Sequence, residues 1–464
     1  MQPMGHATPT ATPGSAPGPS PRWWGLPLLA AMRRDYLGFC AGLQRVHGDL
    51  VHMRIARERC VDIFHPELLR SALVDHADAL IRWERGPEVF AQLMGQSVLV
   101  TEGTTWQRQR RTLQQAFTPR RVAAWAALMV DAARAGLDRA VPARQDRALV
   151  PMDRLFSHLT MDVILRTLFS TPAGADTAAA AHAVQVLSEG AMREMFWPMT
   201  LPDWLPLPGK AAKRAALRRM RALVGGHIAA RQHPWAANPP PNDLLGLLVS
   251  LRDEDTGQAL SAAEVFDQCM VSFQAGHETS ATTLLWWSWL LATHPAAAAR
   301  AAQEVDSVLA GRAPGPEDMA AMPWLTATLK EAMRLYPPVA ALMTRRTLRP
   351  ITLGGHALPA RTLIRVTPWV LHRDPRWFAQ PEAFQPERFM PGAAPPLRGT
   401  YLPFGLGPRV CLGQHFALLE MTLIGALLLQ RYTLAVPAGG TTPQPVLNVT
   451  LRPAQPLYLE FVRR

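Results

Sequence analysis

Lysine is almost missing from this sequence. Its 464 residues include 48 basic side chains, but only Lys210, Lys213 and Lys330 are lysines, so arginine carries nearly all of the formal net charge of +12. A basic balance can indicate an acidic partner, and an arginine- and alanine-rich compositional bias explains it equally well. Because no dense basic stretch interleaved with aromatic residues is present, we do not expect nucleic-acid binding.

Cysteine is also scarce. Cys40, Cys60, Cys269 and Cys411 are widely separated, with no paired spacing that suggests a disulfide framework or a zinc site. No run of about 18 uncharged apolar residues is present, so no transmembrane anchor is expected. Residues 1–21 lack the apolar region of a signal peptide. The sequence therefore predicts a soluble, reduced, cytoplasmic protein.

The spacing of apolar residues predicts one large, mainly α domain with small β-sheets. Residues 1–21 are rich in Pro, Gly, Ala, Ser and Thr and are predicted to form a disordered leader, and residues 22–464 form the domain. Three- and four-residue apolar spacing marks the helices, whereas alternation marks the strands. Helices are expected at 122–137, 161–169, 212–228, from about 243, at 261–294 and at 412–431, strands at 49–55, 60–64, 351–353, 362–367 and 457–462, and irregular segments at 238–242 and 375–413.

The strongest local signal is the decapeptide 404–413, Phe-Gly-Leu-Gly-Pro-Arg-Val-Cys-Leu-Gly. Three glycines and a proline make a tight loop, and Cys411 stands near its end, where the next helix begins. A thiolate gains there from the helix dipole and from free backbone N–H groups, which can tune its donation to a metal. Arg409 can pair with an anionic group of a cofactor. The alternative is a buried structural cysteine in a turn.

The decapeptide matches, at every fixed position, the Phe-Gly-x-Gly-x-Arg-x-Cys-x-Gly signature of the cytochrome P-450 family, which the chain resembles from about residue 25 to its end. The resemblance implies the cytochrome P-450 fold and a haem b whose iron is bound by the Cys411 thiolate, a ligand that favours O–O cleavage. It further implies that Phe404 shields the sulfur and that Arg409 binds a haem propionate. Gly405 and Gly413 would belong to the same haem-binding loop.

A glutamate and two arginines resemble the Glu-Arg-Arg triad of that family. Glu331 and Arg334 lie one helical turn apart, a spacing that alone is typical of a surface ion pair, and Arg388 follows in a Pro-Glu-Arg-Phe turn. The resemblance implies a structural role, in which the three side chains hold the coil that leads to the cysteine loop. His372 begins a His-Arg-Asp-Pro segment that is also common in the family, and it receives no firm role.

The long predicted helix contains Ala275, Gly276, Glu278 and Thr279, which resemble the oxygen-binding segment of the family. A glycine inside a helix costs about 1 kcal/mol relative to alanine, so it needs a reason. The resemblance implies that Gly276 leaves room for dioxygen, that Thr279 hydrogen-bonds the bound oxygen, and that Glu278 helps to deliver protons. A packing glycine followed by a polar patch is the alternative. His277 is not proposed as a ligand.

Trp106 and Arg110 lie four residues apart and therefore share a helix face. On their own they suggest a cation–π pair on the surface. The resemblance instead implies a Trp-x-x-x-Arg motif in which both side chains contact the haem propionates. Arg345 is a further candidate for such a contact.

The resemblance implies an enzyme. It would be a haem-dependent monooxygenase that uses O2 and two externally supplied electrons to oxidise, most simply to hydroxylate, a hydrophobic small molecule such as a terpenoid or fatty acid. The motifs are closer to the fatty-acid-hydroxylating, eukaryote-like branch, and the intact Glu278–Thr279 pair favours reductive over peroxide-driven chemistry. The alternatives are an enzyme that couples or desaturates its substrate and a non-catalytic haem-binding sensor, which would not need that pair.

The electrons are expected to come from another protein. About fifty residues follow the cysteine loop, too few for a flavin or iron–sulfur domain, so NAD(P)H would act only through a separate ferredoxin or flavodoxin and its reductase. Charge reversal on the face that an acidic donor approaches should slow reduction, although a solvated basic helix face is the alternative. The arginines predicted for this face are Arg108, Arg111, Arg120 and Arg121.

An apolar pocket for a hydrophobic substrate is predicted from two segments. Contact of the second segment with a membrane surface is left open, and the protein is expected to be a monomer. The segments are residues 85–96, with Phe90, Leu93 and Met94, and residues 195–207, with Phe196, Trp197, Trp204 and Leu205.

Overall fold

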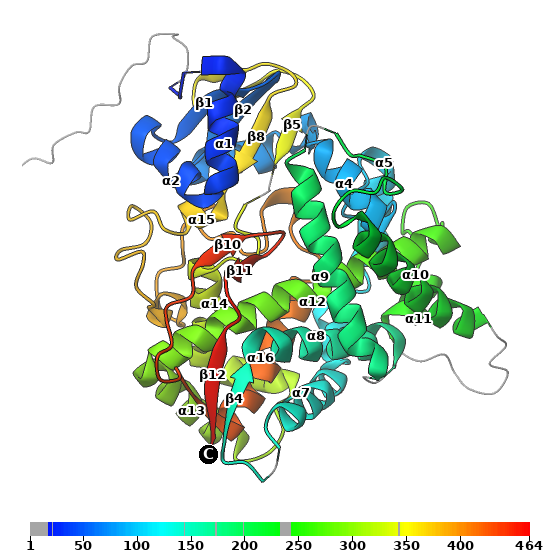
Figure 1. Ribbon diagram of the computed structural model, residues 1–464, viewed down its shortest axis with the longest axis vertical. Helices are drawn as coiled ribbons and strands as arrows, with labels where there is room; N and C mark the ends of the chain where they lie inside the picture. Colours follow the sequence, from blue (N-terminus) through cyan, green and yellow to red (C-terminus); the bar gives the residue numbers. More distant parts are fainter. Residues whose placement is uncertain are drawn as a thin grey trace, which may run out of the picture.

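The computed structural model describes residues 17–20, 22–142, 144–171, 174–197, 199–232, 243–341 and 344–464. Residues 1–16 and 21 of the predicted leader, and the predicted loop at 238–242, lie outside these described residues. The described end of the leader lies against the first strand, where the carbonyl of Pro17 accepts a hydrogen bond of 2.9 Å from the N–H of His52. The described chain is mainly helical with small sheets, which confirms the predicted fold class (Figure 1).

A five-stranded sheet forms one end of the molecule (Figure 1). Its strand order is β1-β2-β8-β5-β3, with the predicted hairpin β1–β2 antiparallel and β8 parallel to β2. Buried Arg365 joins β8 to β2 through hydrogen bonds of 3.0 and 2.8 Å to Asp62, so neither buried charge lacks a partner. The elements of this end are η1 (Arg22–Gly25), α1 (Leu26–Arg34), α2 (Tyr36–His47), β1 (Leu50–Ile55), β2 (Glu58–Ile63), α3 (Pro66–Arg70), η2 (Ser71–Asp75), η3 (Ala77–Ala79), β3 (Leu80–Arg82), β5 (Arg345–Thr347), β8 (Leu363–Val366) and α15 (Pro368–Leu371).

Helices around α12 (Ala262–Thr293) build the rest of the body, and α12 crosses the middle of the molecule in Figure 1. Ser261 and Glu264 form a capping box at its start, since each side chain accepts a hydrogen bond from the backbone N–H of the other. The helix ends before Pro295, which starts α13. The other helices are α4 (Arg85–Met94), α5 (Gly103–Gln114), α6 (Pro119–Ala123), α7 (Ala126–Ala140), α8 (Met152–Phe169), α9 (Ala175–Met195), α10 (Lys210–Gln232), α11 (Leu244–Ser250), α13 (Pro295–Leu309), α14 (Pro323–Leu335) and α16 (Gln414–Arg431).

Most of the predicted helices are present, and one of them is interrupted. The helix expected at 122–137 is divided between α6 and α7, because Trp125 leaves the helical conformation with φ −94° and ψ 0°. Its buried ring packs edge-on against Phe416 of α16. The interruption places this tryptophan under the helix that follows the cysteine loop, which apolar spacing alone does not reveal.

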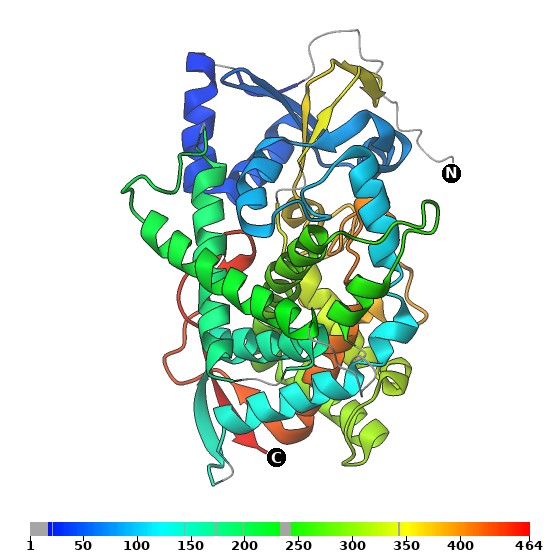
Figure 2. The ribbon, with the colours of Figure 1, turned by 90° about the vertical axis from the view of Figure 1, so that its right-hand side faces the viewer.

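Smaller sheets complete the fold. A three-stranded sheet of order β4-β12-β9 lies at the end opposite the five-stranded sheet, and both views agree on this arrangement (Figures 1 and 2). The remaining elements are β4 (Arg147–Pro151), β6 (Ile351–Leu353), β7 (His356–Leu358), β9 (Tyr432–Ala435), β10 (Pro445–Leu447), β11 (Leu451–Pro453), β12 (Tyr458–Arg463), η4 (Pro316–Ala321), η5 (Pro386–Phe389) and η6 (Gly407–Arg409).

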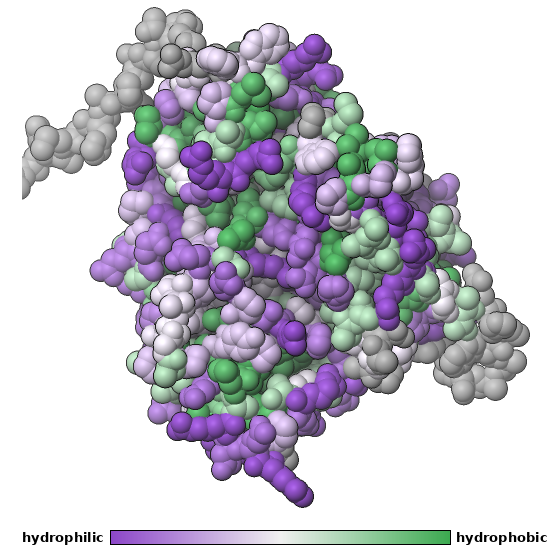
Figure 3. All heavy atoms as spheres, in the orientation of Figure 1, coloured by the Kyte–Doolittle hydropathy of each residue, from purple (hydrophilic) through white to green (hydrophobic). Residues whose placement is uncertain are grey.

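The described helices are not of the kind that crosses a lipid bilayer, since none combines sufficient length with sufficient apolar character. On the face shown in Figure 3, hydrophobic patches are small and are separated by hydrophilic side chains. Exposed large hydrophobic residues occur singly or in short groups, as in Trp23 and Trp24 near the N-terminal end and in Trp204 before α10.

Candidate functional site

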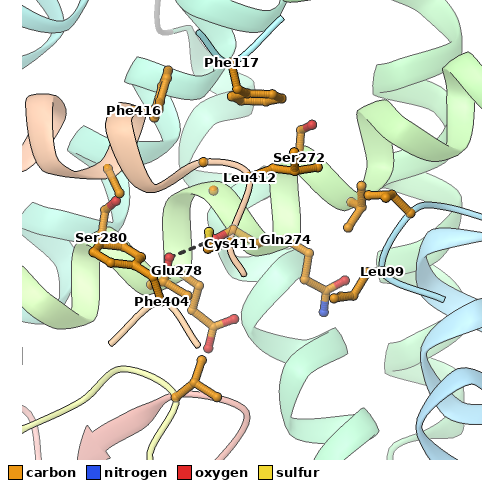
Figure 4. Close-up of a pocket in the computed structure, with 18 of the residues that line it drawn as sticks. Leu99, Phe117, Ser272, Gln274, Glu278, Ser280, Phe404, Cys411, Leu412 and Phe416 are labelled. Atoms are coloured by element: carbon orange, nitrogen blue, oxygen red, sulfur yellow. Dashed lines mark hydrogen bonds between the residues drawn. The ribbon is translucent and has the colours of Figure 1, made fainter. Parts of the chain in front are cut away.

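A cavity of about 450 Å³ separates the cysteine loop from α12. Figure 4 shows Cys411 in this space, with Phe404 to one side of it. The wall of the cavity is mostly apolar and is drawn from many elements that are far apart in the sequence. Its apolar side chains include Phe90, Met94, Val98, Leu99, Leu113, Phe117, Leu244, Leu248, Val271, Met333, Val339, Phe404, Leu412 and Phe416.

The loop that carries Cys411 needs its glycines. Gly405 and Gly407 have φ of +82° and +78°, a region that other residues rarely adopt. A Cβ on Gly407 would lie 2.2 Å from the carbonyl oxygen of Leu73, so the loop packs backbone to backbone against η2. The N–H of Cys411 donates a 2.9 Å hydrogen bond to the carbonyl of Phe404, which closes the loop. Any larger side chain at Gly407 would push the loop away from η2.

The Cys411 side chain is exposed to the cavity and surrounded by protein on its other sides. Burial raises the pKa of its thiol, while a backbone hydrogen bond from Gly413 and the positive charge of Arg110 act in the opposite direction. Gly413 is the N-cap of α16, so the sulfur lies at the positive end of a helix. These are the donors that stabilise a thiolate ligand.

Arg409 and Trp106, which the sequence assigned to the same cofactor, contact each other. The Arg409 guanidinium lies over the Trp106 ring, with Cζ 4.1 Å from the ring centroid. It also pairs with Glu102 and donates to the Thr101 carbonyl at 3.3 Å. Burial lowers the pKa of Arg409 to about 10. The predicted alternative, a cation–π pair of Trp106 with Arg110, is not what forms.

Four arginines line the cavity. They are Arg82, Arg110, Arg345 and Arg409. Among the described residues, Glu102 is the one carboxylate that forms an ion pair with any of them: it pairs with Arg409 and lies 3.4 Å from Arg82. Among the described residues the buried Nε of Arg110 has no hydrogen-bond partner. Burial lowers the pKa of both Arg110 and Arg345. This excess of half-buried cations beside a cysteine sulfur fits an iron porphyrin with two propionates.

The segment 275–279 of α12 faces Cys411 across the cavity. Ala275, Gly276 and Thr279 line the cavity, and the Thr279 hydroxyl donates to the Ala275 carbonyl at 2.8 Å. A Cβ on Gly276 would lie 2.7 Å from Cδ1 of Ile164, so this glycine also allows α8 to pack closely on α12. Both reasons considered for Gly276, space for dioxygen and close packing of helices, are therefore compatible with its position. His277 points into the core, where Nδ1 contacts the Phe273 carbonyl at 2.8 Å.

Glu278 is the centre of a buried hydrogen-bond network. Its carboxylate accepts hydrogen bonds from Ser188 at 2.5 Å, from Thr450 at 2.8 Å and from Arg452 at 2.9 Å. The Glu278 side chain is 1% exposed, whereas that of Arg452 is 26% exposed. The network therefore connects the cavity wall to the protein surface through β11.

The structure brings the three residues of the predicted triad into contact. Glu331 accepts from Arg334 at 2.8 and 2.7 Å and lies 3.4 Å from Arg388. Arg334 is fully buried and also donates to the carbonyls of His372, Pro381 and Ala383 at 2.7 to 3.0 Å. One guanidinium thus fixes a helix end to the coil that precedes the cysteine loop.

The prediction that residues 195–207 line the pocket is wrong. Phe90 and Met94 of the first segment line the cavity, whereas the described residues of 195–207 do not. Phe196 instead packs edge-on against Tyr36 at 6.5 Å, and Trp204 is 74% exposed. Phe196 thus covers the N-terminal helices rather than the cavity, whereas Trp197 and Trp204 are exposed. Leu93 of the first segment is buried in the core.

Two of the four arginines predicted to meet a redox partner are already neutralised within the chain. Arg108 pairs with Glu264, and Arg111 pairs with Asp253 and Asp255 at 3.1 and 3.2 Å. Arg120 is exposed on α6 and has no ion pair among the described residues. A docking role for all four is therefore not supported by these contacts.

Two comparisons with known proteins agree with this geometry. The sequence model of the Cytochrome P450 family matches residues 16–461. A protein of Streptomyces melanosporofaciens named cyclooctat-9-en-7-ol 5-monooxygenase is 35% identical over 447 residues, which are 93% of this chain and 91% of that protein. Cyclooctatin synthase of the same organism is 35% identical over 458 residues, 95% and 96% of the two chains. Pentalenene oxygenase of Streptomyces avermitilis is 30% identical over 463 residues, 98% of each chain.

Proposed function

The chain belongs to the cytochrome P450 family and is a P450 monooxygenase, and from this premise we propose that it hydroxylates a terpenoid. The observation that carries the proposal is the apolar cavity in which Cys411 faces segment 275–279 of α12. An apolar wall suits a hydrocarbon-rich substrate. The names of the relatives quoted above refer to cyclooctatin and pentalenene chemistry, which favours a terpenoid over a fatty acid.

We propose that Cys411 binds the haem iron and that Arg409, Arg110, Arg345 and Arg82 bind the propionates. Haem bound in this way supplies the activation of O2. Gly405 and Gly413 shape the loop around the sulfur, and Phe404 keeps water from it. Trp106 acts indirectly, because its ring fixes the guanidinium of Arg409.

Thr279 and Glu278 would handle the protons that monooxygenation consumes. Because the Thr279 hydroxyl donates to Ala275, its oxygen is left as a hydrogen-bond acceptor that faces the cavity. Glu278 is connected to the surface through Arg452. We propose that protons reach the cavity through this carboxylate, and that Gly276 leaves space beside Thr279 for dioxygen.

Electrons would come from a separate ferredoxin or flavodoxin and its reductase, with NAD(P)H as their source. Arg120 is the best-placed of the predicted arginines, since it is exposed on α6, which packs against α16 just after Cys411. The charge reversal Arg120→Glu should slow reduction about tenfold at low salt without changing substrate affinity. Arg57→Glu, in the exposed turn between β1 and β2, is the matched control. Equal reduction rates in the two variants would contradict this docking site. The cytoplasmic location and monomeric state stay predictions from the sequence.

The function is tested with the purified holoprotein, a surrogate ferredoxin system and a panel of terpenoids and fatty acids under ¹⁸O2. We expect a ferrous–CO band characteristic of thiolate ligation and a terpenoid product that carries one ¹⁸O atom. Cys411→Ser should lose both signals. Consumption of NADPH without incorporation of ¹⁸O into any terpenoid, or incorporation only into fatty acids, would contradict the proposed substrate class. Coupled or desaturated products lacking ¹⁸O would favour the alternative outcome.

A further inference from the structure

Gln274 presents a hydrogen-bond acceptor to the cavity. It lies on α12 one turn before Glu278, is 6% exposed and lines the cavity. Figure 4 shows its side chain reaching toward Leu99. Its single side-chain hydrogen bond within the described protein is a long one of 3.4 Å, from Nε2 to the hydroxyl oxygen of Ser188.

The direction of the neighbouring hydrogen bonds fixes the orientation of this amide. Glu278 is ion-paired with Arg452, so as a carboxylate it can only accept. Ser188 must therefore donate its one proton to Glu278, to which it is bonded at 2.5 Å. The Ser188 oxygen can then only accept, and the group of Gln274 that faces it must be the NH2 group. The carbonyl oxygen, Oε1, points the other way.

Oε1 of Gln274 accepts no hydrogen bond from the described residues. It is also not among the unpaired atoms that are inaccessible to solvent. It is therefore open to the cavity. The neighbouring hydroxyls on α12 offer no proton in its place, because Ser272, Thr279 and Thr283 each donate to the carbonyl one turn earlier. A buried acceptor without a donor is costly, and a ligand that supplies the donor is selected strongly.

We propose that Gln274 selects a terpenoid that already bears a hydroxyl group, whose O–H donates to Oε1. This inference rests on the proposed function and narrows its substrate class from terpenoids to terpenoid alcohols. A ketone or an ether would place an oxygen acceptor against Oε1, and a hydrocarbon would leave Oε1 unpaired. The enzyme is thus suited to a second or later oxidation, after a hydroxylating or alcohol-forming reaction has supplied the first hydroxyl.

The test measures binding to the holoprotein by equilibrium dialysis and by the high-spin shift of the haem band. Its probes are menthol, menthone and p-menthane, with cedrol and cedrane as a larger pair. We expect at least one alcohol to bind about tenfold more tightly than its hydrocarbon, and menthol more tightly than menthone. Gln274→Leu should abolish the advantage of the alcohol, whereas Ser272→Ala, which removes a hydroxyl already bonded within α12, should keep it.

Ser188→Ala gives a second, independent readout. Without the Ser188 oxygen the Gln274 amide is free to turn and present its NH2 group, so menthone should gain affinity while menthol keeps most of its own. The proposal is overturned if no alcohol binds more tightly than its matched hydrocarbon, or if the advantage survives in Gln274→Leu. If the same samples show the normal ferrous–CO band of a thiolate-ligated haem, such a result overturns only the role of Gln274. If that band is lost, the proposed function itself is overturned.

Discussion

His372 accepts a 2.8 Å hydrogen bond from the backbone N–H of Leu402 through Nε2, at the start of the loop that carries the candidate haem ligand. Its other ring nitrogen, Nδ1, lies 3.1 Å from the carbonyl oxygen of Arg334. Because a carbonyl can only accept, Nδ1 must carry the proton and Nε2 must be bare. One neutral imidazole therefore ties the buried ion pair of α14 to the cysteine loop.

Protonation of His372 would break this connection. Burial lowers the pKa of His372 from 6.5 to about 3, so the folded protein keeps the ring neutral. Between pH 6.5 and about 3 the unfolded chain binds a proton that the folded chain does not, and stability falls as the pH falls. Above pH 6.5 the contribution of the ring is complete.

The variant His372→Leu should lose about 2–5 kcal/mol at pH 7.5, because it leaves a buried N–H and a buried carbonyl unpaired. Urea unfolding of wild type and variant from pH 4 to 8 measures the difference in the free energy of unfolding. This difference should shrink as the pH falls below 6.5. A difference that stays constant over that range would show that His372 is protonated in the folded protein as well.

Replacement of Arg334, even by lysine, should destabilise the protein. Arg334→Lys cannot reach both Glu331 and three carbonyl oxygens, so buried partners are left unpaired at a cost of about 3–5 kcal/mol. We expect little haem incorporation, measured as the ratio of haem to protein absorbance. Arg388→Lys is the matched control, since Arg388 is less buried than Arg334, lies 3.4 Å from Glu331, and donates to two carbonyls, those of Ala379 and Gln380, from one nitrogen. Equal haem content in both variants would contradict this ranking.

Gly276 and Ile164 should show strong energetic coupling. Gly276→Ala gains about 1 kcal/mol of helix propensity, but its Cβ would lie 2.7 Å from Cδ1 of Ile164, and overpacking costs about 1–3 kcal/mol. Ile164→Val removes that Cδ1 atom, so the double variant should be more stable than the sum of the single changes by about 1–3 kcal/mol. Urea unfolding of the four proteins measures this coupling. Additive effects would mean that Ile164 or α8 moves away from the new Cβ at no energetic cost.

The cysteine loop and the segment 275–279 could be predicted from sequence because each is continuous and its chemistry depends on residues a few positions apart. The capping box of α12 and the proline that begins α13 are local signals of the same kind. The triad is spread over 57 residues between Glu331 and Arg388, yet its members stand in recognisable short motifs. Short sequence motifs were therefore sufficient to predict functional residues whose position is set by their own stretch of backbone.

Partners supplied by distant elements could not be predicted in this way. Arg82 and Glu102 reach the cluster around Arg409 because β3 and the start of α5 are brought beside the cysteine loop, and neither stands in a motif. Ser188 and Arg452 lie 90 and 174 residues from Glu278. Residues 195–207 have the composition of a pocket wall, but composition does not specify which neighbour an aromatic ring covers.

Arg452 gives the sharpest test of the proton route through Glu278. Their 2.9 Å ion pair is the only contact by which a cation in the described chain reaches this carboxylate. We expect Arg452→Leu to lower turnover about tenfold, which is less than the roughly 10²–10⁴-fold usual for loss of a general acid or base, because Glu278 itself is kept. Substrate affinity should change less than twofold. The solvent deuterium isotope effect on turnover should rise, because proton delivery then limits the rate.

Two further variants separate this role from a structural one. Arg452→Lys keeps a cation near Glu278 and should recover most of the turnover and of the normal isotope effect. Arg463→Leu removes an arginine from β12, the next strand along the chain. Within the described chain its guanidinium donates to backbone carbonyls, lies over the Tyr432 ring and forms no ion pair with a carboxylate, so this variant should match wild type. If Arg452→Leu loses turnover with no rise in the isotope effect, the ion pair serves only to hold β11 against α12, and protons reach the cavity by a path that avoids Glu278.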